Sequence, residues 1–143
     1  MRRVPPWAWL VGLVLASFAL RAWLARDMLG PFIMVDELIY SELGRSLAAS
    51  GELLVRDVPS PGYGIVYPAL ISPAYLAFER LTDAYAAVKT LNSLLMSLAA
   101  VPAYLLARRV VRPWLALLGA VLAVSIPSLV YTGTVMTENV FYP

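Results

Sequence analysis

The chain has 143 residues, of which 61% are hydrophobic and 14% are charged, and its mean hydropathy is +0.75. A soluble domain of this length needs far more polar surface, so the composition favours an integral membrane protein of one domain. The absence of cysteine and histidine excludes disulfides, thiolate or imidazole metal sites and histidine acid–base chemistry, and the net charge of +2 gives no reason to expect nucleic acid as a partner.

The first predicted membrane span is residues 7–25. It follows a basic start and two prolines, and tryptophans of the kind that anchor at membrane interfaces lie near its ends: Trp7, Trp9 and Trp23. A cleaved signal peptide also has a basic start and an apolar run, but this run is long and no small-x-small cleavage site follows it. We therefore expect a retained span, in which Arg21 either snorkels outward or faces a protein cavity.

Two further spans are predicted at residues 85–107 and 114–131, because each contains roughly 20 mostly apolar residues. The short connection between them is basic and carries Arg108, Arg109 and Arg112. The positive-inside rule places this connection and the basic N-terminus in the cytoplasm. We therefore expect a multi-pass cell-membrane protein with a cytoplasmic N-terminus and a long outer loop at residues 26–84.

Acidic residues are concentrated on the predicted outer side of the membrane. The loop 26–84 contains eight of the nine acids in the chain: Asp27, Asp36, Glu37, Glu42, Glu52, Asp57, Glu79 and Asp83. The ninth, Glu138, follows the third span, at the start of a second outer loop at residues 132–143. Exclusion of acids from the bilayer explains why the spans lack them, but it does not explain why the cytoplasmic ends lack them too.

Within the outer loop, apolar residues recur every four positions over residues 35–50, which predicts a helix with Gly51 as its C-terminal stop. Asp36 and Glu37 then lie in the first turn, where free backbone N–H groups stabilise negative charge, so helix capping is the ordinary interpretation of this pair. A second helix is predicted at residues 67–78. It is too short to cross the membrane and contains two prolines, so we expect it to lie on the outer membrane surface.

The order of these features resembles the GT-C glycosyltransferases, polytopic enzymes that use polyprenyl-phosphate sugars and include protein O-mannosyltransferases, aminoarabinose transferases and arabinosyltransferases. The resemblance is carried by Asp36-Glu37-Leu38-Ile39-Tyr40 after the first span, by Tyr67-Pro68-Ala69-Leu70 on the second outer helix, and by Thr137-Glu138-Asn139 after the third span. Such enzymes have more spans than this chain, so the resemblance implies an N-terminal portion that is inactive by itself.

The resemblance implies transfer of a sugar from a polyprenyl-phosphate carrier to a lipid, glycan or protein hydroxyl on the non-cytoplasmic face. Asp36 would be the general base, and Glu37, the second catalytic candidate, would orient the acceptor or the helix. A divalent metal ion is the candidate cofactor, with Glu138 as its ligand. The candidate substrate-binding residues are Tyr40, Arg56, Tyr67, Lys89, Glu138 and Asn139.

The predicted fold is therefore an all-α polytopic membrane protein, with three transmembrane helices and a long outer loop that carries amphipathic juxtamembrane helices. Two other functions stay open from the sequence. One is a small non-catalytic membrane protein, such as a transporter subunit or an assembly scaffold. The other is a module that binds or flips lipid phosphates. The small polar residues at the centre of the second span, Asn92, Ser93 and Ser97, are expected to serve helix packing rather than ligand binding.

Overall fold

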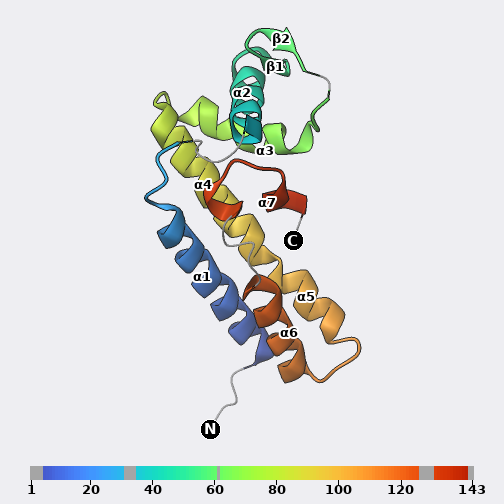
Figure 1. Cartoon of the computed structure of the whole chain (residues 1–143). Helices are drawn as coiled ribbons and strands as arrows, with labels where there is room; N and C mark the ends of the chain where they lie inside the picture. The colour runs from blue at the N-terminus through green and yellow to red at the C-terminus, as the bar shows by residue number, and fades with distance from the viewer. Residues whose placement is uncertain (1–4, 31–34, 61, 126–130, 142–143) are drawn as a thin grey trace.

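The computed structural model describes residues 5–30, 35–60, 62–125 and 131–141 and is mostly helical. Long apolar helices form one end of the molecule, and shorter helices with a small hairpin form the other (Figure 1). The elements in chain order are α1 (Pro6–Ala25), α2 (Val35–Ser50), β1 (Leu54–Val55), β2 (Val58–Pro59), α3 (Val66–Ala77), α4 (Leu81–Leu98), α5 (Ala100–Ala107), α6 (Pro113–Ser125), the 3-10 helix η2 (Tyr131–Gly133) and α7 (Glu138–Phe141).

Two of the described helices are long and apolar enough to cross a membrane. Helix α1 has 20 residues and begins with Pro6, whose fixed φ and missing N–H suit a first helical position. Helices α4 and α5 follow one another over Leu81–Ala107, 27 residues that begin four positions before the predicted span 85–107. They are separated at Ala99 because the ring of Pro102 disturbs the carbonyl four residues earlier. The first two predicted apolar segments are therefore confirmed as helices.

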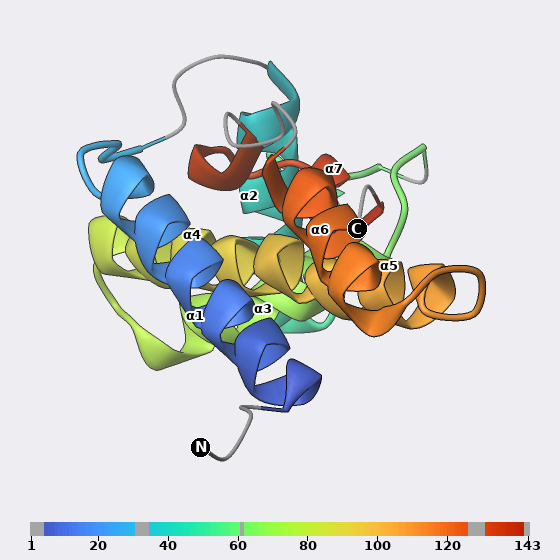
Figure 2. The ribbon, with the colours of Figure 1, turned by 90° about the horizontal axis from the view of Figure 1, so that it is seen from below.

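The third predicted span, 114–131, is described only in part. Helix α6 covers Pro113–Ser125, a shorter apolar helix of 13 residues. Residues 126–130 lie outside the described part of the chain, and Tyr131 belongs to η2. Helices α4 and α5 follow one another along nearly the same line, and Figure 2 shows α1 beside α4 and α6 beside α5. The basic turn joins α5 to α6.

Small residues set the packing between these long helices. Ala100 on α5 and Ala116 and Ala120 on α6 are fully buried together with Leu10 of α1 and Tyr104 of α5. Alanine side chains allow helix backbones to approach closely, as they do at helix interfaces in membranes. The outward faces of the same helices carry large apolar residues that stay exposed in this chain, including Leu15, Leu118 and Leu122.

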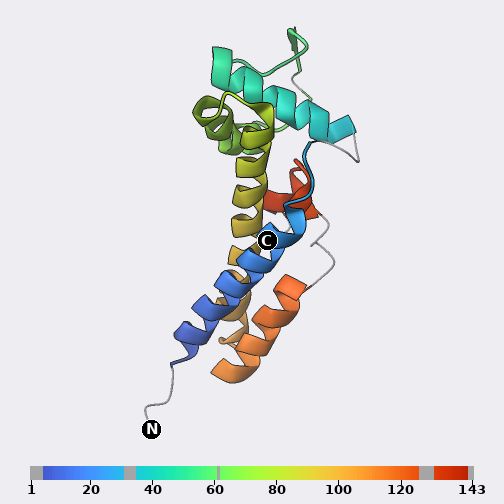
Figure 3. The ribbon, with the colours of Figure 1, turned by 90° about the vertical axis from the view of Figure 1, so that its left-hand side faces the viewer.

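The predicted helix over residues 35–50 is confirmed, since α2 has these bounds and Gly51 follows it with φ +77°. This left-handed conformation is the one that makes glycine a common helix terminator. The predicted helix 67–78 is confirmed as α3, one residue earlier at each end. Figure 3 shows α2 running across the direction of the long helices, beyond the upper end of α4.

A short hairpin after α2 was not predicted. Strands β1 and β2 pair antiparallel through Leu54 with Pro59 and Val55 with Val58. The two turn residues, Arg56 and Asp57, both have positive φ, at 51° and 64°. This is the pattern of a type I′ turn, which usually carries Asn-Gly, so the sequence lacked the expected signal.

Helices α2 and α3 approach so closely at Gly44 that no side chain fits there. A Cβ atom at this position would lie 2.7 Å from Cγ1 of the buried Ile71 and 3.1 Å from the Tyr75 ring. We expect Gly44→Val to lower the free energy of unfolding by about 1–3 kcal/mol, because overpacking exceeds the small gain in helix propensity. Denaturant unfolding in detergent measures this effect. The control is Gly12→Val, where a Cβ meets nothing within 4 Å, and equal losses at both positions would contradict the prediction.

Candidate functional site

The acidic pair at the start of α2 divides into one exposed and one buried carboxylate. Asp36 is exposed, whereas the side chain of Glu37 has 0% exposure. Successive residues of a helix point about 100° apart, so neighbouring side chains face different surroundings. Of these two carboxylates, only Asp36 is therefore open to a ligand in the described structure. It lies in the first turn of α2, where backbone N–H groups have no partner within the helix.

Glu37 connects α2 to two distant parts of the chain. Its Oε1 accepts a hydrogen bond from the hydroxyl of Tyr85 at 3.1 Å and another from the backbone N–H of Val135 at 3.0 Å. The Tyr85 hydroxyl also lies 3.3 Å from the carbonyl oxygen of Gly133. Hydrogen bonds to a buried carboxylate compensate the cost of removing its charge from water. We refer to this set of contacts as the Glu37 tie.

The segment 132–136 is buried although it is largely not helical, so its backbone groups need partners from elsewhere. Side-chain amides supply them. Asn92 donates to the carbonyl of Thr134 at 2.9 Å, and Asn139 donates to the carbonyls of Thr134 and Met136 at 3.0 and 3.1 Å. Asn139, a predicted substrate-binding residue, is fully buried and its amide nitrogen already has these partners.

The two tyrosines that were predicted to bind substrate, Tyr40 and Tyr67, contact each other. Tyr67 is fully buried; its hydroxyl donates to Asn92 Oδ1 at 3.3 Å and accepts from Asn92 Nδ2 at 3.1 Å. Burial raises the pKa of Tyr67, which keeps the hydroxyl protonated and able to donate. Tyr40 makes edge-to-face contacts with Tyr67 and Tyr63, both at 5.5 Å between ring centroids. Tyr40 of α2 thus packs against Tyr63 and Tyr67 in one aromatic group.

Two buried cations hold the ends of neighbouring helices. Lys89 donates to the carbonyls of Ala25 and Met28, at the C-terminal end of α1. Arg21 donates to the carbonyl of Val124, near the end of α6, at 2.8 Å, and to the hydroxyl of Thr132 at 2.9 Å.

Cations are favourable at helix C-termini because unpaired carbonyls gather there. Arg21 was expected either to extend outward to the membrane surface or to face the protein interior. Its burial and its bonds to Val124 and Thr132 show that it faces the interior. Lys89, predicted to bind substrate, is engaged by the protein's own backbone.

Glu138, the candidate metal ligand, lies at the start of α7 and is partly exposed. Its Oε2 accepts a hydrogen bond from the Thr137 hydroxyl at 3.4 Å. Within the described ranges, no group of three or more carboxylate, histidine or cysteine side chains could hold a metal ion. Further ligands would therefore have to come from a substrate phosphate, from solvent or from residues outside those ranges.

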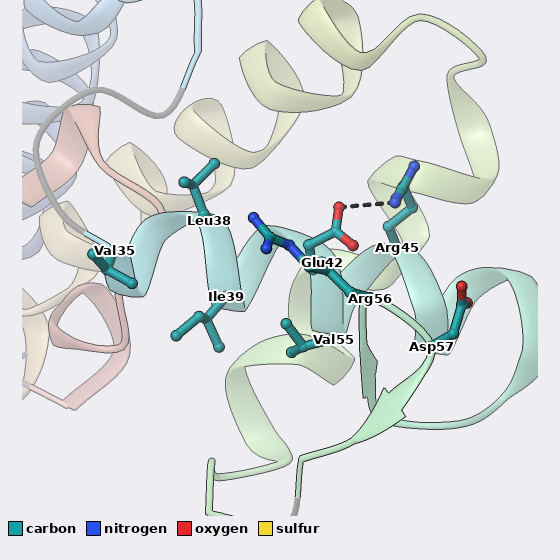
Figure 4. A pocket seen from close by; sticks show the side chains of 8 residues that line it. All are labelled: Val35, Leu38, Ile39, Glu42, Arg45, Val55, Arg56 and Asp57. Carbon is teal, nitrogen blue, oxygen red and sulfur yellow. Dashed lines mark hydrogen bonds and ion pairs between the residues drawn. The ribbon is translucent and has the colours of Figure 1, made fainter.

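Arg56 lies in a different place, in an open groove between α2 and the hairpin. The groove has a volume of about 710 Å³, with an apolar part and a charged part (Figure 4). Its lining residues are Val35, Leu38, Ile39, Glu42, Arg45, Val55, Arg56 and Asp57. Glu42 and Arg45 form an ion pair at 2.8 Å. No described residue pairs with Arg56, whose side chain extends across the groove in Figure 4.

The structure thus brings Glu37, Tyr67 and Asn139 together around the segment 132–139 and leaves Arg56 apart from them, on the hairpin side of α2. Comparison with protein-family models, with curated proteins and with solved structures finds no match to this chain. The GT-C resemblance stays a prediction that rests on the residues alone.

Sequence reasoning missed the roles of Tyr85 and Val135. Tyr85 stands at the predicted start of a span, where a tyrosine is ordinarily an interfacial anchor. Val135 contributes a backbone N–H, for which a sequence carries no signal.

Proposed function

We propose that the chain is the N-terminal part of a membrane-embedded glycosyltransferase of the GT-C type, which moves a sugar from a polyprenyl-phosphate carrier to an acceptor hydroxyl. The observation that carries this proposal is the exposed carboxylate of Asp36, in a helix turn whose other carboxylate is fixed by the protein. A general base needs access to its substrate and a defined position, and this turn provides both.

In the proposed reaction, the acceptor oxygen attacks the anomeric carbon of the carrier-linked sugar while Asp36 takes its proton. The bond between the anomeric carbon and the phosphate oxygen breaks, and its electron pair leaves with the lipid phosphate. The negative charge on that phosphate requires a cation. Arg56 is the exposed candidate, and a divalent metal on Glu138 is the other; Lys89 is already bonded to two carbonyls.

Helix lengths support a placement of the chain in the bilayer. Leu81–Ala107 would extend about 40 Å, longer than a hydrocarbon core of about 30 Å, whereas α1 matches that thickness. Because Lys89 bonds to the end of α1, the first two turns of α4 would project beyond the membrane there. Helix α2 lies at the same end, so the proposed base would stand just above the bilayer surface.

The distribution of charge supports three spans with a cytoplasmic N-terminus. The basic turn with Arg108, Arg109 and Arg112 lies at the end of the molecule where α1 begins, and the acidic start of α2 lies at the opposite end (Figure 1). The most apolar windows of the two long helices are only 22% and 33% buried within the chain. The remaining apolar surface fits contact with lipid or with further helices.

We expect a topology reporter fused after Arg109 to report the cytoplasm, because the basic turn should be retained on that side. Fusion after Gly62, near the hairpin, is the matched control and should report the outer side. Because this chain contains no cysteine, a single cysteine introduced at either position can also be tested by labelling with a membrane-impermeant reagent. An external signal after Arg109 would contradict the proposed orientation.

A non-catalytic scaffold is the second candidate, and one observation favours it. The Glu37 carboxylate, the Asn139 amide nitrogen and the Lys89 ammonium group all bond to other parts of the protein, as polar groups in a structural core do. The two functions differ in a direct assay. The complete protein that contains this chain, expressed in its membrane and supplied with labelled polyprenyl-phosphate sugar and extracted membrane acceptors, should transfer the label if it is an enzyme and should not if it is a scaffold.

A further inference from the structure

Glu37 is placed where it can control the position of Asp36 without touching a substrate. We propose that Glu37 is a positioning residue, which fixes the first turn of α2 to the segment 132–139 through Tyr85 and the Val135 N–H. This inference rests on the proposed function, because it concerns the geometry of the same site. It narrows the sequence prediction, which grouped Glu37 with Asp36 as catalytic and had Glu37 orient either the acceptor or the helix.

Burial excludes a direct role in the described conformation. The Glu37 side chain has 0% exposure, and Oε1 receives donors from residues 48 and 98 positions away in the sequence. A substrate could reach this oxygen only by displacing Tyr85 or the Val135 amide. That displacement would leave a buried donor or the carboxylate itself without its partner, which is costly in a protein interior.

The Glu37 tie is placed to define the start of α2. The other described polar side-chain contact between α2 and a neighbouring helix is Ser41 with Tyr75, at 2.8 Å, on the α3 side. Apolar packing against α3 holds the later turns of α2, where Leu43 and Gly44 are buried. Glu37 therefore supplies directional contacts in the same turn as Asp36, where apolar packing is sparse, since Val35 and Leu38 are exposed.

The Glu37 tie also connects the two acidic motifs. The backbone just before Val135 is held by Tyr85 and Asn92, which donate to the carbonyls of Gly133 and Thr134. The residues that follow the Val135 N–H include Glu138 and Asn139. A change at Glu37 should therefore alter the position of Asp36 relative to Glu138. Misplacement by about 1 Å at a reacting centre can cost about 10²-fold in rate.

The test compares Glu37→Gln, Glu37→Ala and Tyr85→Phe in the complete membrane protein that contains this chain, with Glu79→Ala as a control at an exposed acid outside the site. Glutamine has a side chain of the same shape as glutamate and keeps one acceptor oxygen, but it carries no charge. We expect Glu37→Gln to keep kcat within about tenfold of the parent, since a neutral acceptor weakens these hydrogen bonds without removing them. Glu37→Ala should lower kcat by about 10²-fold with a smaller change in KM.

Tyr85→Phe should fall between the glutamine and alanine variants, and it keeps the proposal testable if Glu37→Ala does not fold. A folded Glu37→Gln protein as inactive as Glu37→Ala would overturn the positioning role, because the charge itself would then be required. Hydrogen exchange at the Val135 amide gives a readout independent of turnover. Protection should be lost in Glu37→Ala and kept in Glu37→Gln, and unchanged protection in Glu37→Ala would also overturn the proposal.

Failure of the proposed function would look different. If the complete parent protein transfers no sugar, the enzyme proposal fails whatever the exchange of Val135 shows. If Asp36→Asn is as active as the parent, Asp36 is not the base, and the positioning role of Glu37 fails with it. If Asp36→Asn is inactive while Glu37→Ala stays fully active, the enzyme proposal stands and the positioning role fails.

Discussion

Asp36→Asn is expected to abolish sugar transfer, lowering kcat by at least about 10²-fold, because a positioned general base contributes about 10²–10⁴ in rate. Asparagine has nearly the same shape as aspartate but accepts no proton. Asp36 is exposed, and among the described residues no hydrogen bond or ion pair involves its side chain, so the substitution removes none of the described contacts. The fold and the stability should therefore stay close to those of the parent.

The measurement is turnover of a labelled polyprenyl-phosphate sugar in membranes by the complete protein that contains this chain, parent and variant, at equal amounts of folded protein. Asp27→Asn is the matched control, since Asp27 is another exposed aspartate of the predicted outer loop, and its described ion pair is with the exposed Arg26. It should retain full activity. Equal turnover in Asp36→Asn and the parent would remove the proposed base, and equal losses in both aspartate variants would point to a general effect of charge.

The helices of this protein could be predicted because their signals are local. The four-residue recurrence of apolar side chains defined α2, and Gly51 marked its end, since both depend only on neighbouring positions. Hydropathy found α1 and most of Leu81–Ala107 for the same reason. The separation of α4 from α5 follows from the backbone chemistry of Pro102.

The division of roles between Asp36 and Glu37 could not be predicted in the same way. Which of two adjacent carboxylates is buried depends on where Val135 lies, 98 residues further along the chain. The hairpin was missed for a different reason. Its turn uses Arg56 and Asp57 in the left-handed region, where a sequence pattern expects Asn-Gly, and this arrangement costs local strain of the order of 1 kcal/mol or more for each residue.

Lys89 shows how a polar residue near a span end can mislead. The resemblance made Lys89 a candidate for substrate binding, and the structure shows its ammonium group on carbonyls at the C-terminal end of α1. Arg21 has the same relation to α6. In both cases the cation comes from one helix and the carbonyls from another, so only the packing of the two helices reveals the contact.

Asn92 is expected to have a large effect on stability, because it joins three elements from a fully buried position. Its amide nitrogen bonds to the Tyr67 hydroxyl at 3.1 Å and to the Thr134 carbonyl at 2.9 Å. Asn92→Leu keeps the same branching and number of heavy atoms and removes both bonds, which leaves the buried Tyr67 hydroxyl without its Asn92 partner. We expect a loss of about 1–3 kcal/mol in the free energy of unfolding.

Denaturant unfolding in detergent checks this loss, with Thr90→Ala as the control on the exposed face of the same helix. A double-mutant cycle sharpens the test. Because Tyr67→Phe removes the other side of the same hydrogen bond, the double variant should lose less stability than the two single losses added together, by about 0.5–3 kcal/mol. Additive losses would mean that Asn92 acts through the segment 132–136 alone, where the Thr134 carbonyl keeps a second donor from Asn139.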